Sequence, residues 1–263
     1  MYSAFATAGR KREWFLGVGG RTGGRVERVL IGGVCLLLLL WVNPAALSAG
    51  VMAEPYNTKR CGVPRGVTQL TYDDSDYRDV YNVVRLARAA RRLDVGLGIF
   101  QLSEQTRRYE RATGFSIGPE LRRLGMYVGN HTHSHTQLTR LGYEGIRWQM
   151  MNGLNSAYLR PPYGSYDPRI QRIARRLDLR ICMWTFNTKD YFGLSADAIC
   201  RNVVRNAPKG AVVLMHLNQS AANASTLRCM VRGLRARDHR ICRPYTATHP
   251  KEVTPVRLYR LPC

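Results

Sequence analysis

Residues 66–74, Gly66-Val-Thr-Gln-Leu-Thr-Tyr-Asp-Asp74, alternate apolar and polar side chains as a β-strand does and end in two adjacent aspartates. Apolar residues at helical spacing follow over 79–93, and a short apolar run over 95–100 is typical of a second strand. An order of strand, helix and strand is the signature of a parallel sheet, so this stretch predicts an α/β fold.

The same alternation continues to the end of the domain. We expect strands over 126–128, 157–159, 181–184 and 211–215 and a last one from 241, with helices beginning at Pro119 and over 170–177, 195–206 and 225–237. The pattern predicts a parallel sheet of about seven strands, closed as a barrel or open and doubly wound. In both architectures the active site lies beyond the C-terminal ends of the strands.

The chain is strongly basic. Its 263 residues include 40 Lys and Arg against 18 Asp and Glu, which gives a net charge of +22. The hydrophobic content of 45% and the charged content of 22% are ordinary for a globular protein, which excludes disorder of the whole chain. The positive charge suits an anionic partner, such as nucleic acid, a membrane surface or an acidic wall polymer.

The N-terminus has the layout of a secretory signal. Residues 29–42 carry no charge, basic residues precede them and small residues follow. A membrane anchor is the alternative, although spanning needs about 20 apolar residues. We therefore expect a signal peptide over 1–53, a lead-in over 54–65, a folded domain over 66–245 and a tail over 246–263. A secreted or cell-wall-associated protein follows, which argues against nucleic acid and limits membrane contact to an uncleaved N-terminal segment.

Cysteines support export. Removal of 1–53 leaves an even number of them, which are Cys61, Cys182, Cys200, Cys229, Cys242 and Cys263. An even number in an exported chain predicts disulfides, and the sequence leaves fifteen pairings open. The chain holds no CxxC pair, which argues against a thiolate zinc site.

Polar residues follow the strands at their C-terminal ends. They are Asp73-Asp74, the run from Asn130 to His135, Arg160-Pro-Pro-Tyr163, Lys189-Asp190-Tyr191 and His216. His131 and His135 are four residues apart and would point the same way on a helical turn, whereas His133 would not. Two imidazoles and a carboxylate are a usual zinc ligand set, so this group predicts a divalent metal site. Solvent-facing histidines in a polar loop are the alternative.

The aspartate pair suggests two separate tasks. Adjacent side chains of an extended strand point to opposite sides, so one carboxylate could bind the metal while the other acts as a base. Arg160 could orient that base through a bidentate contact. Asp190 could hold Nδ1 of His216 and keep this histidine protonated as a general acid.

These residues resemble the motifs of the polysaccharide deacetylases with the NodB homology domain, carbohydrate esterase family four. Thr71-Tyr-Asp-Asp74 is similar to the family's TFDD motif, and His131-Thr-His-Ser-His135 matches HTxSH. Arg160-Pro-Pro-Tyr-Gly164 matches the third motif, and Leu214-Met-His216 matches LxH. The resemblance spans residues 66–245 and implies a distorted (β/α) barrel.

Carried to these positions, the resemblance implies a role for each residue. Asp74, His131 and His135 would bind zinc or another divalent transition metal, and Asp73, oriented by Arg160, would be the general base. His216, positioned by Asp190, would protonate the leaving amine. Leu214 would contact the acetyl methyl group, and the backbone N–H of Tyr163 would hold the oxyanion.

Three departures from the family pattern concern the substrate groove. The fourth motif, usually DxxDW, is Asn187-Thr-Lys-Asp190-Tyr191, so Tyr191 replaces the indole that walls the sugar site. Ser75 stands where the family has glycine. The segment between His135 and Arg160 is short for the family, which predicts a trimmed helix and a more open groove.

The expected function is removal of N-acetyl groups from a polysaccharide of N-acetylhexosamine, peptidoglycan or chitin-like. The positive charge favours an anionic cell wall as the substrate. An O-acetyl esterase acting on xylan or a related glycan is one alternative. A cationic wall-binding protein with a decayed site is another.

Overall fold

The computed structural model describes residues 57–245 and Cys263. The expected signal peptide, the first residues of the lead-in and the tail up to residue 262 lie outside the described residues. No helix in the described part of the chain is long and apolar enough to cross a membrane.

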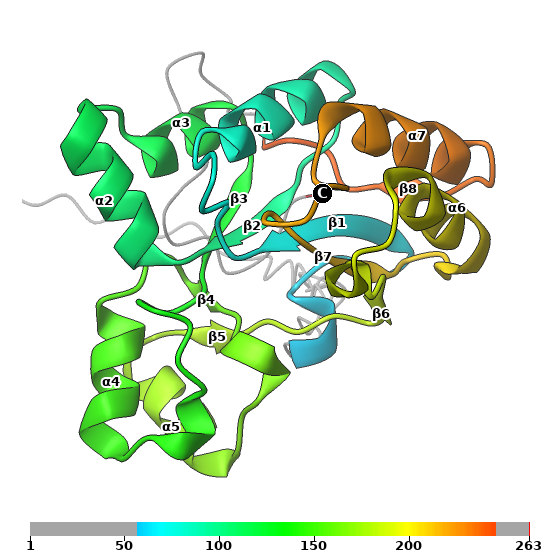
Figure 1. Ribbon diagram of the computed structural model, residues 1–263. Coiled ribbons are helices and arrows are strands. Elements are labelled where there is room, and N and C mark those ends of the chain that lie inside the picture. Colours follow the sequence, from blue (N-terminus) through cyan, green and yellow to red (C-terminus); the bar gives the residue numbers. More distant parts are fainter. Residues whose placement is uncertain (1–56, 246–262) are drawn as a thin grey trace, which may run out of the picture. The chain divides into compact units, whose positions relative to one another are not determined.

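A parallel β-sheet forms the centre of the fold (Figure 1). Its strands are β1 (Val67–Asp73), β2 (Gly98–Gln101), β3 (Tyr127–Asn130), β4 (Tyr158–Leu159), β5 (Arg180–Ile181), β6 (Phe186–Asn187), β7 (Val212–His216) and β8 (Arg240–Ile241). Seven of them follow the order β5-β4-β3-β2-β1-β7-β6, and β8 pairs with the start of β1. The sheet curls into a partly closed barrel, which confirms the predicted fold class.

Helices cover the outer face of the sheet. They are α1 (Asn82–Arg92), α2 (Ser103–Thr113), α3 (Ile117–Arg123), α4 (Tyr143–Met151), α5 (Pro168–Arg176), α6 (Ala196–Asn206) and α7 (Ala224–Arg235). α1 packs against α3 and α7, α7 packs against α6, and α4 packs against α5 beside β4 and β5 (Figure 1). The caps follow sequence chemistry: Ser195 accepts from the backbone of α6, and Asn223, rather than the expected Ser225, caps α7.

The buried side chains form separate clusters on the two faces of the sheet. The main core lies between the sheet and helices α1, α3, α6 and α7, and a smaller one lies under α4 and α5. The inner face is filled by larger side chains and two cystines; it includes Phe100, Tyr127, Tyr158, Cys61 and Cys182. The barrel interior is therefore a packed core, and its upper rim remains for the site.

The barrel wall is open between the two edge strands of the sheet, β5 and β6. The lead-in occupies this place: the N–H of Met183 donates to the carbonyl of Thr58 (2.9 Å), and Nη1 of Arg60 donates to the carbonyl of Gly210 (2.8 Å). The Cys61–Cys182 disulfide joins the lead-in to the residue after β5. The described end of the lead-in is thus part of the domain, not a connection to it.

The remaining cysteines pair as Cys200–Cys229 and Cys242–Cys263. The first bond links α6 to α7, and the second brings the last residue of the chain to the strand end after β8. All six cysteines that follow the expected signal are therefore paired, as their even number predicts.

Candidate active site

A cavity of about 350 Å³ opens at the C-terminal ends of the strands, where the sequence pattern predicts the active site. Its lining includes eight of the residues predicted from the sequence, which are Asp73, Asp74, His131, His135, Tyr163, Tyr191, Leu214 and His216. Arg160 and Asp190 do not line the cavity themselves, but each contacts a residue that does: Arg160 binds Asp73, and Asp190 binds His216.

The potential metal ligands converge on one point. Nε2 of His131 and Nε2 of His135 lie 3.3 and 3.2 Å from Oδ1 of Asp74. The ligand atoms of all three residues lie within 4.8 Å of one another. Such a carboxylate and two imidazoles match the donor set of catalytic zinc sites, which keep open positions for water and substrate.

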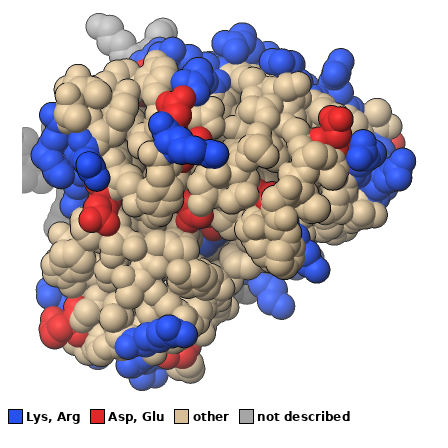
Figure 2. Space-filling view, in the orientation of Figure 1, with Lys and Arg blue, Asp and Glu red and all other residues tan. Residues whose placement is uncertain are grey.

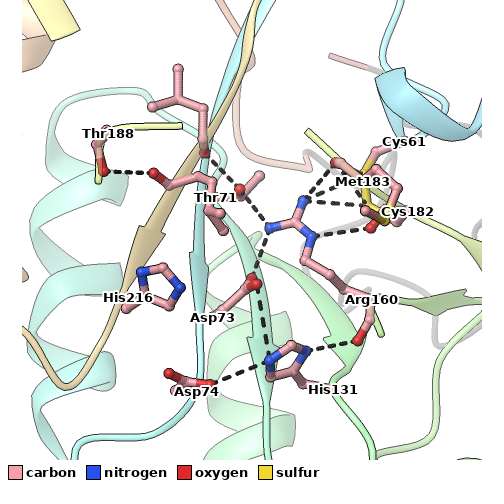
Figure 3. Close-up of polar contacts among 12 residues, drawn as sticks. Cys61, Thr71, Asp73, Asp74, His131, Arg160, Cys182, Met183, Thr188 and His216 are labelled. Atoms are coloured by element: carbon pink, nitrogen blue, oxygen red, sulfur yellow. Dashed lines mark hydrogen bonds and ion pairs between the residues drawn. A yellow bond between two sulfur atoms is a disulfide. The ribbon is translucent and has the colours of Figure 1, made fainter. Parts of the chain in front are cut away.

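The bonding of these residues also fits a cation. Oδ1 of Asp74 is buried and accepts no hydrogen bond from the described residues. Nδ1 of His131 lies 2.7 Å from the carbonyl of Arg160 and donates to it, which leaves the lone pair of Nε2 facing the site (Figure 3). Burial raises the pKa of Asp74, but when the two imidazoles are protonated their hydrogen bonds and charge outweigh burial and lower this pKa below its usual range.

The histidine motif has a different backbone from the expected one. His131 and His135 are not on a helical turn, because Thr132 (φ 73°) and His135 (φ 62°) adopt the left-handed region. Asn130 Oδ1 accepts from the N–H of Thr132 (2.7 Å), and Gln149 from α4 accepts from the N–H of His133 (3.1 Å). The loop is therefore folded around side-chain acceptors, and it brings the two imidazoles together.

His133, between the two potential ligands, points elsewhere. Its ring packs edge-on against Trp148 at 4.8 Å, and its Nδ1 lies 3.0 Å from the hydroxyl of Ser103. His133 thus lies outside the group of potential ligands, as the spacing of the motif predicts.

Asp73 faces the same cavity from the end of β1. Arg160 Nη1 donates to Oδ1 of Asp73 (2.7 Å) and to the hydroxyl of Thr71 (2.8 Å) (Figure 3). The prediction that Arg160 contacts Asp73 through two nitrogens is wrong, because its Nε and Nη2 donate to backbone carbonyls instead. Oδ2 of Asp73 accepts no bond from Arg160. It lies 4.0 Å from Nε2 of His131, on the side of the potential metal ligands.

His216 stands directly across from Asp73, because the two residues are paired in the ladder between β1 and β7. Asp190 Oδ1 lies 2.8 Å from Nδ1 of His216, and Asp190 Oδ2 accepts from its backbone N–H (2.7 Å). Burial lowers the pKa of His216, but the hydrogen bond to Asp190 and the charge of Asp73 outweigh it and raise this pKa. The imidazole is thus favoured in its protonated form.

Three further predicted residues border the cavity. Tyr163 has a positive φ of 59°, its ring lies 4.6 Å from His135, and its backbone N–H donates no hydrogen bond within the described residues. Leu214 is buried in β7. The Tyr191 ring contacts His216 edge-on at 5.5 Å, and its hydroxyl accepts a bond from Asn187.

Four other residues of the lining are not among those predicted from the sequence. Trp184, Asn187, Asn218 and Gln219 border the cavity. Asn218 donates from Nδ2 to Oδ2 of Asp74 (3.4 Å), whereas both histidines lie nearest to Oδ1. Asn218 therefore contacts a potential metal ligand through its other carboxylate oxygen. Its position two residues after His216, at the same strand end, was the available signal.

Comparison with known proteins adds the family. Residues 62–182 match the family model described as polysaccharide deacetylase. A peptidoglycan-N-acetylglucosamine deacetylase of Bacillus cereus is 26% identical over 185 residues, which cover 67% of this chain and 61% of that protein. A bifunctional xylanase/xylan deacetylase of Cellvibrio japonicus is 31% identical over 120 residues, which cover 42% of this chain and 18% of that protein. The chain thus spans less than two thirds of the length of these relatives.

Solved structures show the fold. The CE4 family pseudoenzyme BA3943 of Bacillus anthracis superposes with a TM-score of 0.58 at 22% identity, over 67% of this chain and 63% of that one. A pseudoenzyme with this fold shows that the architecture by itself implies no activity. From its family model, its relatives and its strand-end motifs, this chain belongs to the polysaccharide deacetylase family with the NodB homology domain, carbohydrate esterase family four.

Proposed function

We propose that this protein is a secreted, metal-dependent hydrolase that removes N-acetyl groups from a polysaccharide of N-acetylhexosamine. One observation carries the proposal: Asp73 and His216 are register partners on the neighbouring strands β1 and β7, and both line the cavity that Asp74, His131 and His135 also line. A carboxylate base and a protonated imidazole in one cavity suit amide hydrolysis, which needs both.

Asp74, His131 and His135 would hold the cation. A bound divalent cation supplies a lowered pKa for water and polarises the substrate carbonyl. Because Nδ1 of His131 donates to the carbonyl of Arg160, its ring orientation is fixed before any ion arrives. Zinc fits two nitrogen donors and one oxygen donor, and another divalent transition metal would fit the same set.

Asp73 is the general base of the proposed reaction. The bond from Arg160 occupies Oδ1 and turns Oδ2 toward the cavity, where it takes a proton from the attacking water. The N–H of Tyr163, free of hydrogen bonds within the described residues, would donate to the oxyanion that forms on the substrate carbonyl.

His216 is the general acid. Asp190 engages Nδ1 and leaves Nε2 to protonate the leaving nitrogen, which allows acetate to depart. The raised pKa of His216 keeps the donor protonated to higher pH than an ordinary histidine.

Asp190→Asn should shift the pH dependence of the reaction. Loss of the carboxylate lowers the pKa of His216, so the protonated acid is lost at lower pH and the alkaline limb of the kcat/KM profile moves to lower pH. Turnover near pH 7 should fall by about tenfold or more. Rates measured from pH 5 to 10 on an N-acetylated chitooligosaccharide test this. An alkaline limb in the wild-type position would contradict the role of Asp190.

The cavity rim offers aromatic surface to a sugar. Tyr191 and Phe192 are both exposed, and their rings lie 4.8 Å apart. Lys and Arg side chains lie along much of the edge of the face shown in Figure 2, where they outnumber the carboxylates among them. A cationic periphery would attract an anionic wall polymer, and one relative is named for peptidoglycan. Both features support a cell-wall glycan as the substrate.

Tyr191→Ala should weaken substrate binding without removing the catalytic groups. Loss of the ring takes away sugar-stacking surface, so KM should rise by about three- to tenfold, corresponding to about 1 kcal/mol of ring contact. Initial rates over a range of chitooligosaccharide concentrations give KM and kcat separately. Tyr143→Ala, an exposed tyrosine on α4 that does not line the cavity, is the matched control. An unchanged KM for Tyr191→Ala would remove this residue from the sugar site.

An O-acetyl esterase activity is the second candidate, because one relative is named as a xylan deacetylase. The two activities use the same base and cation site and differ in the leaving group. An alcohol leaves more readily than an amine, so ester cleavage depends less on protonation by His216.

Acetate release from three substrates tests the proposal. We expect release from peptidoglycan and from N-acetylated chitooligosaccharides, and less from acetylated xylan, under the same conditions. Release from xylan alone would replace the N-deacetylase proposal with the esterase. No release from any of them, by protein that retains a bound divalent metal, would refute both.

A further inference from the structure

The Arg160 side chain, which orients the proposed base, is fully buried inside the barrel. Besides Asp73 and Thr71, it binds backbone carbonyls: Nε donates to Cys182 (3.1 Å) and Nη2 donates to Met183 (3.0 Å). A buried guanidinium with one carboxylate partner needs its other donors satisfied by fixed acceptors. The direction of Arg160 therefore depends on where residues 182 and 183 are held.

A disulfide holds these two residues. Cys182, whose carbonyl binds Nε, is bonded to Cys61, and Nη2 of Arg160 lies 3.5 Å from the sulfur atoms of both cysteines (Figure 3). Both cysteines are buried, with exposed fractions of 2% and 0%. The bond thus forms the wall of the guanidinium pocket on the side away from Asp73.

This wall also closes the opening in the barrel. Neither β5 nor β6 continues across residues 182–185, and the lead-in covers the place through Cys61 and the bond from Met183 N–H to the Thr58 carbonyl. Without the lead-in, water would reach the guanidinium and compete for its donors. Exclusion of water strengthens the ion pair with Asp73, because the local dielectric is low.

Two aromatic rings, those of Phe100 and Trp184, also restrict the position of the guanidinium. The ring of Phe100 lies 4.1 Å below it and the ring of Trp184 lies 5.8 Å away. Phe100 is itself fixed, because its ring packs where a side chain at Gly129 would be, 2.1 Å from a Cβ at that position. The sulfur side is the wall to which the lead-in contributes, through Cys61.

We propose that the Cys61–Cys182 disulfide is a positioning element for the catalytic base, acting through Arg160. This inference rests on the proposed function. Loss of the bond releases residues 182 and 183 and the lead-in, so Arg160 turns away from Asp73 and the base loses its orientation. The metal group and the sugar-binding rim keep their own supports, so turnover falls while metal binding and KM are retained.

Paired variants separate positioning from general stability. Cys61→Ala with Cys182→Ala should lower kcat on an N-acetylated chitooligosaccharide by about tenfold or more, with KM changed by less than about threefold and bound zinc unchanged. Cys200→Ala with Cys229→Ala removes a disulfide between α6 and α7, in a different buried cluster from Cys61 and Cys182, and should keep kcat within about twofold. Rates are taken well below the Tm of each variant. A kcat within twofold for the first pair would overturn the proposal.

A second measurement tests the proposal even if the double variant Cys61→Ala with Cys182→Ala does not fold. The wild-type protein is titrated with a phosphine reductant, free thiols are trapped by alkylation, and peptide masses give the fraction of each disulfide that is open. We expect activity to fall with the open fraction of Cys61–Cys182 and not with that of the other two. Full activity in protein with this bond open would overturn the proposal. Absence of acetate release by untreated wild-type protein would instead refute the proposed function.

Discussion

Asp73→Asn should reduce turnover by about 10²- to 10⁴-fold, because the amide cannot accept the proton of the attacking water. The variant should keep its metal, since Asp74, His131 and His135 are unchanged. It should also fold, because the amide oxygen can still accept the bond from Arg160 Nη1 that the carboxylate accepts at 2.7 Å. Acetate release and zinc content of the same preparation check both statements.

Asp79→Asn is the matched control for this variant. Asp79 is a partly exposed carboxylate shortly before α1 that pairs with Arg85 and does not line the cavity. Its replacement should leave turnover unchanged. Loss of metal in Asp73→Asn would mean that the roles of Asp73 and Asp74 are exchanged, and wild-type turnover would mean that Asp73 is not the base.

His131→Ala should lose metal and activity together. This residue supplies one of the three potential ligands and is the one whose ring is fixed by the carbonyl of Arg160. Replacing even an outer-shell partner costs about 10- to 100-fold in metal affinity, so loss of a direct ligand should cost at least about 100-fold. Metal titration of the apo protein measures the affinity, and acetate release measures the activity.

His133→Ala gives the comparison within the same motif. Its ring lies against Trp148 and Ser103 rather than in the ligand group, so its loss should leave metal affinity near the wild-type value. Equal loss of metal in both variants would show that the motif acts by folding the loop. Unchanged metal in His131→Ala would contradict the ligand assignment.

Sequence periodicity was sufficient for most strands and for the helices with an apolar stripe. β1 and β7 are buried along nearly their whole length, and α1, α6 and α7 present one apolar face to the core. The pairing of Asp73 with His216 could be anticipated in part, because polar residues at the ends of parallel strands meet on one rim.

Two helices had no such signal. α2 buries only Ser103 and Thr106, so its sequence has no apolar stripe. On α4 the side chains of Trp148 and Met151 face solvent, while Gln149 is buried to bind the histidine loop. The buried face of α4 therefore mixes core residues, Ile146 and Met150, with a polar one, and periodicity does not show such a face.

The spacing of residues in the sequence also could not predict which residues hold the site in place. Left-handed backbone at Thr132 and His135 is set by side-chain acceptors from Asn130 and Gln149, which lie outside the five-residue motif or at its edge. Cys61 belongs to a segment that looks like a polar lead-in, and its contact with Arg160 depends on a partner 121 residues away. Such contacts arise from tertiary structure alone.

The most direct test of the account is acetate release by the wild-type protein before chelation, after chelation and after stoichiometric zinc is returned. An N-acetylated chitooligosaccharide is the substrate in all three samples. We predict release by the untreated protein, loss of release with the metal removed, and recovery when zinc is added. Release that continues at the same rate in protein shown to be free of divalent metal would contradict the assignment of Asp74, His131 and His135 as the metal site of a deacetylase.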